Sequence, residues 1–117
     1  MQLCPITVQF VVDFCKVQLG PYDLQQLHAF GSRVYGTARE NSDHDFFAVV
    51  GDEAPEDILT GSALHMQLFE RLERQRKAAG LGPIDLLIMR ASSFARSSIK
   101  PGTFAFDATE KGVQVRL

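Results

Sequence analysis

Apolar residues recur at helical spacing in two long stretches of the chain. Residues 5–19 show this spacing between Pro5, which suits a first helical turn, and Gly20-Pro21, which ends the segment. Residues 56–79 show it again, up to Gly80. The spacing predicts a helix over the first stretch and over most of the second. On the second helix, the side facing the core is expected to carry Leu64, Met66, Leu68, Phe69 and Leu72.

Two shorter runs, 45–50 and 84–89, are almost continuously apolar. Such runs are typical of strands that are buried on both faces, and the first is expected to be central in its sheet. The remaining pattern is weaker, and glycine, proline and polar residues divide it. It predicts strands at 24–30 and 113–117, short helices at 32–36, 92–99 and 103–111, and loops at 39–43 and 51–55.

Composition places the chain among ordinary globular domains. Its 117 residues fit one domain over 1–117, 45% of them are hydrophobic, and no linker or repeat interrupts the pattern. The net charge of −2 gives no overall attraction for nucleic acid. The basic residues at 71–77 are interleaved with Glu70 and Glu73, which is typical of a solvated helix face.

Location is suggested by what the sequence lacks. No apolar run approaches the roughly 20 residues of a membrane-spanning helix, and the N-terminus has no basic region of the kind that begins a signal peptide. Cys4 and Cys15 form no metal-binding motif, and their separation along a helix is too long for a disulfide. We therefore expect a reduced, cytoplasmic protein.

A glycine–serine turn follows the first predicted strand. Gly31 permits close approach of the backbone to a ligand. The Ser32 hydroxyl, together with backbone N–H groups at a helix start that serine could cap, can bind phosphate oxygens. Gly36 would keep the next turn narrow, and Arg33 and Arg39 are candidates for charge-assisted contacts to phosphate. The turn is a candidate phosphate-binding site.

Carboxylates gather just after this turn. Asp43 and Asp45 are two residues apart, so in a strand their side chains share one side. Asp85 begins the next apolar run and can reach the same place if the two strands are neighbours. Like charges this close repel, and a hard divalent cation such as Mg²⁺ resolves the conflict. Three carboxylates suit two ions about 3.5–4 Å apart, the arrangement used for in-line displacement at phosphorus.

Each of these motifs also has an ordinary structural interpretation. A lone Asp-x-Asp is usually a loop or a cap, and a lone Gly-Ser is usually a turn. His44 is expected to be structural or exposed, and His28 and His65 are not expected to be catalytic. The order and spacing of the glycine, serine and aspartate residues together favour a functional site.

The motifs together resemble the signature of the nucleotidyltransferase superfamily that includes DNA polymerase β. The resemblance rests on Gly31-Ser32-Arg33-x-x-Gly36-Thr37-Ala38, followed by Ser42-Asp43-x-Asp45-Phe46, and on Asp85 in an apolar strand. It is strongest toward the minimal nucleotidyltransferase domains and covers nearly the whole chain. Phe46 stands where leucine or isoleucine is more usual, which is a change of packing.

The resemblance implies a fold and a chemistry. The fold would be α/β (α+β), a mixed β-sheet with helices packed mainly on one face, as in the polymerase β palm. Asp43, Asp45 and Asp85 would hold Mg²⁺, as two ions, and Gly31, Ser32, Arg33 and Gly36 would bind the phosphates of ATP or another NTP. The reaction would move a nucleoside monophosphate, AMP above all, to an acceptor hydroxyl with release of pyrophosphate.

The acceptor is the open part of this expectation. About 30 residues flank the motifs on each side, which leaves no room for the acceptor-binding domain of larger relatives. Minimal members resemble antitoxins that act on a helical HEPN-type toxin, by binding it or by adding AMP to a tyrosine. A small-molecule (antibiotic-type) nucleotidyltransferase and a non-catalytic binding module are the alternatives. A homo-oligomer is possible, and neither a membrane nor a nucleic acid is an expected partner.

Overall fold

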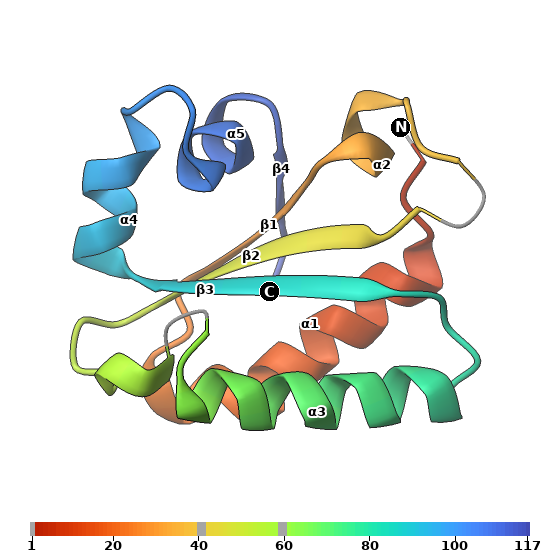
Figure 1. The fold of residues 1–117 in the computed structure, drawn as a ribbon, viewed down its shortest axis with the longest axis horizontal. Coiled ribbons are helices and arrows are strands. Elements are labelled where there is room, and N and C mark those ends of the chain that lie inside the picture. Colours follow the sequence, from red (N-terminus) through yellow and green to blue (C-terminus); the bar gives the residue numbers. More distant parts are fainter. Residues whose placement is uncertain (1, 40–41, 59–60) are drawn as a thin grey trace.

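The computed structural model describes residues 2–39, 42–58 and 61–117 (Figure 1). Within these residues the strands form one four-stranded sheet of β1 (Gln26–Phe30), β2 (His44–Val50), β3 (Ile84–Arg90) and β4 (Val113–Val115). The α-helices are α1 (Pro5–Leu19), α2 (Ser32–Tyr35), α3 (Ala63–Ala78), α4 (Ala91–Ser98) and α5 (Phe104–Glu110). Two 3₁₀ turns accompany them, η1 (Gly20–Tyr22) and η2 (Glu56–Ile58).

The sheet is mixed, as expected. Its strand order is β3-β2-β1-β4, with β2 and β3 parallel and the other neighbours antiparallel. The central position expected for residues 45–50 is confirmed, because β2 lies between two strands and is buried along almost its whole length. The parallel pair requires a crossover, which α3 provides between β2 and β3.

Helices cover the two faces of the sheet unequally. The long helices α1 and α3 lie on one face, where alternate residues of β2 (Phe46, Ala48 and Val50) join the main core. The short helices α4 and α5 cover part of the opposite face, over Phe30, Phe47 and Val49 (Figure 1). We call this second surface the α4/α5 face. No helix of the described residues is long and apolar enough to cross a membrane.

The stretch 56–79, expected to be mostly helical, is an α-helix only in its later part. The chain makes the η2 turn at its start, and α3 begins at Ala63, after Ser62 at the cap position. Residues 59 and 60 of that expectation lie outside the described residues. Expected helix ends elsewhere agree closely with α1, α4 and α5.

The expected core side of α3 is also partly wrong. Met66 is 49% exposed and Phe69 37% exposed, whereas His65, Leu68 and Leu72 are buried. Buried positions 65, 68 and 72 follow the three-to-four-residue spacing of one helix face, and positions 66 and 69 are rotated away from it by about 100°. The helix thus has a narrower buried stripe than its hydrophobic content indicated.

His65 ties α3 to the sheet. Its Nε2 donates to the Leu86 carbonyl (3.1 Å), and its Nδ1 accepts from the Gly61 N–H (3.4 Å). These two bonds define a neutral ring with its proton on Nε2. The side chain is only 8% exposed, so His65 is structural, in line with its sequence-based interpretation.

Replacing this ring tests its structural role. We expect His65→Ala to lower the free energy of unfolding by about 1–3 kcal/mol, because a buried carbonyl loses its donor and a cavity opens. Met66→Ala, its exposed neighbour, should change stability by less than about 0.5 kcal/mol. Urea unfolding measures both variants. Equal stabilities for the two would show that the contact between α3 and β3 does not depend on His65.

Candidate active site

Parallel pairing of β2 and β3 brings two of the expected acids together. Asp45 and Asp85 are direct partners in the register, at the second position of each strand. Because side chains alternate along a strand, both lie on the α4/α5 face, two residues before Phe47 and Leu87. Both carboxylates are half-buried. The condition set for a shared site, that the two apolar strands are neighbours, is therefore met.

The third acid, Asp43, precedes β2 and is exposed. Its charge nevertheless reaches the other two. The pKa of Asp45 is raised to about 6, first by burial and then by the charges of Asp85 and Asp43. Burial and the charge of Asp43 also raise the pKa of Asp85. The site therefore holds more negative charge than its surroundings balance.

These acids suit a hard divalent cation. They offer only carboxylate oxygens, the ligands that Mg²⁺ prefers, and the pKa values of Asp45 and Asp85 are raised first by burial and then by a repulsion that a cation would relieve. Among residues 2–39, 42–58 and 61–117, however, no three His, Cys, Asp or Glu side chains converge closely enough to form a metal site as they stand. The common site of Asp43, Asp45 and Asp85 remains a prediction.

Gly31 joins the glycine–serine turn to the carboxylates. Its φ of 80° lies in the region that favours glycine. A Cβ at this position would overlap Oδ2 of Asp45, so the backbone approaches the acid more closely than any other residue would allow. Gly31 is also the N-cap of α2, and Ser32 is its first residue without a capping hydrogen bond from a side chain. The expectation that serine caps this helix is therefore wrong.

The turn is closed on its other side by Gly36. Its φ is 85°, and its N–H donates to the Ser32 carbonyl (3.0 Å), which ends α2 after one turn. The short helix thus begins at Ser32, directly after the glycine that contacts Asp45. A phosphate-binding role for Gly31, Ser32 and Gly36 remains a prediction that this geometry permits.

Arg33 has structural contacts that the sequence did not predict. Its Nε and Nη2 donate to the Ser42 carbonyl (3.2 and 3.0 Å), and its Nη1 donates to the Gln2 carbonyl (3.2 Å). Gln2 in turn exchanges two hydrogen bonds with the backbone of Ala38. Arg33 therefore fixes the segment that leads into β2. Its expected contact with phosphate, and that of the exposed Arg39, remain predictions.

The other two histidines are structural. His44 is buried, and its Nε2 accepts from the Cys4 N–H (3.1 Å). Burial and the charge of Arg33 lower the pKa of His44. His28 is stacked on Phe94 with ring centroids 5.4 Å apart, and burial lowers its pKa. The described structure thus gives both rings packing roles, as expected.

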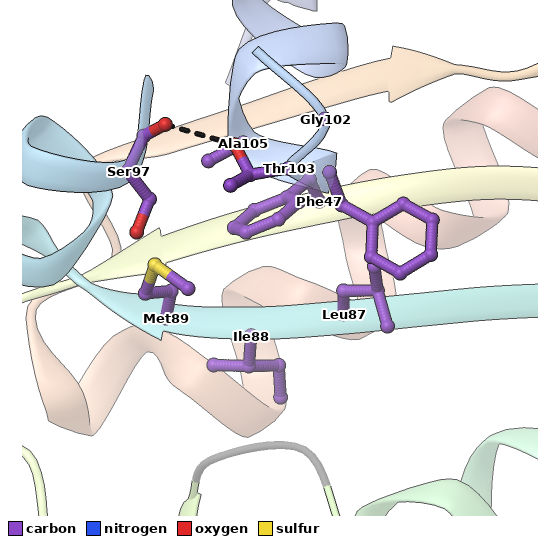
Figure 2. A pocket seen from close by; sticks show the side chains of 9 residues that line it. Phe47, Leu87, Ile88, Met89, Ser97, Gly102, Thr103 and Ala105 are labelled. Atoms are coloured by element: carbon purple, nitrogen blue, oxygen red, sulfur yellow. Dashed lines mark hydrogen bonds between the residues drawn. The ribbon is translucent and has the colours of Figure 1, made fainter. Parts of the chain in front are cut away.

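An apolar pocket adjoins the carboxylates on the same sheet face, and sequence reasoning missed it. Its volume is about 360 Å³, within the range of ligand sites. It is lined by Phe47, Leu87, Ile88, Met89, Ser97, Gly102, Thr103, Phe104 and Ala105. Figure 2 shows Met89 and Ile88 on opposite sides of β3, with Met89 toward Ser97 and Thr103. The alternation of side chains along β2 and β3 could have predicted which residues form the floor of the pocket. It could not have predicted the position of the helices above it.

Comparison with known proteins agrees with this geometry. The family described as "Nucleotidyltransferase domain" matches residues 12–99. A toxin–antitoxin structure with AMP-PNP has 20% identity and a TM-score of 0.59, and the match covers 92% of this chain and 70% of that chain. Two mutants of the toxin–antitoxin MntA-HpeT, at 19% and 18% identity and with the same coverage, give TM-scores of 0.57 and 0.56. No curated protein matches the sequence.

Proposed function

The chain belongs to the nucleotidyltransferase domain family, and we propose that it moves AMP from ATP to an acceptor hydroxyl with release of pyrophosphate. The observation that carries this proposal is the register of Asp45 and Asp85 beside Gly31. It sets Asp45 beside Asp85 and against the backbone of Gly31, which supports a shared site for metal and phosphate. Positioning and charge neutralisation of this kind are what phosphoryl transfer requires.

Each part of the site has a role in this scheme. Asp43, Asp45 and Asp85 would hold Mg²⁺, as two ions. Bound Mg²⁺ neutralises charge on the phosphoryl oxygens and favours ionisation of the attacking hydroxyl. Gly31, Ser32 and Gly36 would bind the triphosphate through backbone N–H groups and the serine hydroxyl, with Arg33 close behind. The half-buried position of Asp45 and Asp85 limits competing water around the reacting group.

For the acceptor, we propose a tyrosine on a HEPN-type toxin partner. The solved structures of similar fold support it, because one is a toxin–antitoxin with AMP-PNP and another is a mutant in which a tyrosine is replaced by alanine. A third carries glutamate in place of two aspartates that are two residues apart, the spacing of Asp43 and Asp45 here. A cytoplasmic location and a role as antitoxin would follow.

A labelling experiment tests the reaction. The protein is incubated with Mg²⁺, α-phosphate-labelled ATP and the protein encoded next to it, and we expect label on the neighbour. Asp43→Ala and Asp85→Ala should each abolish the labelling. Unchanged labelling in these variants would refute the assignment of the acids. If Asp45→Asn still neutralises the neighbour without labelling it, contact rather than chemistry carries the biological effect.

Metal binding should depend on pH in a defined direction. At pH 7.5 Asp45 is ionised, whereas at pH 5 it is largely protonated because its pKa is about 6. We expect Mg²⁺ at about ten times its dissociation constant to raise Tm by roughly 5 °C at pH 7.5. The shift should largely vanish at pH 5 and in the Asp45→Asn variant. Thermal unfolding with Mg²⁺ or EDTA measures it, and an equal shift at both pH values would contradict the site.

A further inference from the structure

The apolar pocket continues the carboxylate site along the sheet. Phe47 and Leu87, which form part of its floor, each lie two residues beyond Asp45 and Asp85 on the same strands. Two residues along a strand correspond to about 7 Å. A group held in the pocket can therefore place one end at the carboxylates without leaving the α4/α5 face.

The pocket and the phosphate turn lie on opposite sides of the carboxylates. β1 runs antiparallel to β2, and Phe30 pairs with Asp45. Gly31, the next residue of the chain, therefore lies beside the start of β2. Phe47 lies on the other side of Asp45, toward the end of β2. In an in-line displacement, the incoming hydroxyl is opposite the leaving group. With pyrophosphate at the turn, the acceptor enters from the pocket.

The lining favours one kind of acceptor. Of the residues that form the pocket, only Ser97 and Thr103 have polar side chains. The Thr103 hydroxyl is already engaged, because it donates to the Ser97 carbonyl (2.8 Å; Figure 2). It also accepts from the Phe106 N–H (3.1 Å). A nucleobase would leave several polar atoms without partners here. A phenol has a single polar group, its hydroxyl, which would lie at the carboxylates and not in the apolar pocket.

We propose that this pocket binds the aromatic ring of a tyrosine that carries the acceptor hydroxyl, an inference that rests on the proposed function. Phe104 is 64% exposed and offers a ring face, and Met89 offers a sulfur for contact with the ring. The phenolic oxygen forms a bond to the α-phosphorus of ATP. The bond from that phosphorus to the bridging oxygen breaks, its electron pair leaves with pyrophosphate, and the phenolic proton passes to water.

Binding can be measured without catalysis. N-acetyl-tyrosinamide is added to isotope-labelled protein with Mg²⁺ and a non-hydrolysable ATP analogue, and N-acetyl-serinamide serves as the comparison. We expect the tyrosine compound alone to shift the amide resonances of Leu87, Met89 and Thr103. Phe104→Ala should weaken its binding about tenfold. Ile99→Ala is the matched control, because Ile99 is 78% exposed, lies on the same segment and is not part of the pocket.

Transfer provides the second readout. With Mg²⁺ and ATP, the tyrosine compound should stimulate pyrophosphate release. Phe104→Ala should raise the KM of the tyrosine compound about tenfold, whereas the dissociation constant of the ATP analogue should change less than about twofold. Binding of the tyrosine compound at the pocket without transfer would support this inference and refute the proposed function. The inference is overturned if the ATP analogue alone shifts the pocket resonances and Phe104→Ala weakens binding of the analogue. It is also overturned if the serine compound binds as tightly as the tyrosine compound.

Discussion

Asparagine in place of Asp45 is expected to lower nucleotidyl transfer by about a thousandfold and, in the absence of metal, to make the protein more stable. The loss of activity follows from removing a charge that would hold Mg²⁺, which supplies several kcal/mol of transition-state stabilisation. The gain in stability follows from the raised pKa of Asp45, about 6 in the folded protein.

The sign of the stability effect follows from proton binding. Between the ordinary aspartate value and pH 6 the folded state binds the Asp45 proton more tightly than the unfolded state, so wild-type stability falls as pH rises through this window and stays low above it. The Asp45→Asn variant has no proton to lose at this position and would escape the fall. We expect it to be more stable than wild type by roughly 1–3 kcal/mol at pH 7.5, with solvent screening reducing the full effect, and almost unchanged at pH 4.

Urea unfolding in EDTA at the two pH values measures this difference, and pyrophosphate release measures transfer. Asp57→Asn is the matched control, because Asp57 is exposed in η2, which follows the opposite end of β2 from Asp45. Asp57→Asn should leave transfer unchanged and should change the free energy of unfolding by less than about 0.5 kcal/mol. If Asp45→Asn were less stable than wild type at pH 7.5, burial and repulsion of the Asp45 charge would not be the dominant effect at this position.

The second large effect is expected at Gly31. Alanine there should lower the free energy of unfolding by about 2–4 kcal/mol and remove transfer. The φ of 80° strains any residue with a Cβ, by about 1–2 kcal/mol. The new Cβ would also overlap Oδ2 of Asp45, so the carboxylate must move out of place. Stability and transfer are therefore linked through a single steric contact.

A matched glycine separates the two causes. Gly80 has a φ of 72°, and a Cβ there would meet no atom within 4 Å. Gly80→Ala should therefore show only the backbone strain, about 1 kcal/mol, with transfer unchanged. In an Asp45→Ala background, Gly31→Ala should cost less than in wild type, since the overlapping atom is gone, but more than Gly80→Ala, because the ψ of −164° at Gly31 belongs to a region that only glycine adopts readily. A cost that stays at about 2–4 kcal/mol in that background would show that the overlap is not its source.

Sequence reasoning was most successful where pattern and chemistry coincide. The apolar runs at 45–50 and 84–89 identified β2 and β3, and the position of an aspartate near the start of each anticipated that the two would meet. Burial of a strand on both faces leaves a clear signal, since almost no polar residue is tolerated. The mixed sheet and the family followed from the same residues.

Failures came where the outcome depends on distant contacts. Nothing local distinguishes Met66 and Phe69 from core residues of α3, and only the docking angle on the sheet leaves them exposed while His65 reaches Leu86. Arg33 binds carbonyls at residues 2 and 42, which the chain brings together only when folded. The roof of the pocket likewise comes from the segment between α4 and α5, whose position no periodicity encodes.

The parallel pair of β2 and β3 has a consequence for how the site is assembled. Asp45 and Asp85 are separated by a long crossover, so closing that loop must precede any meeting of the two acids, and their contact forms late in folding. β3 is also an outer strand of the four-stranded sheet, and β2 is its one neighbour among the strands of the described residues. A strand paired on one side loses all its ladder hydrogen bonds when that single pairing opens. Fraying of this one strand would dismantle the acidic pair while the remaining sheet stays folded.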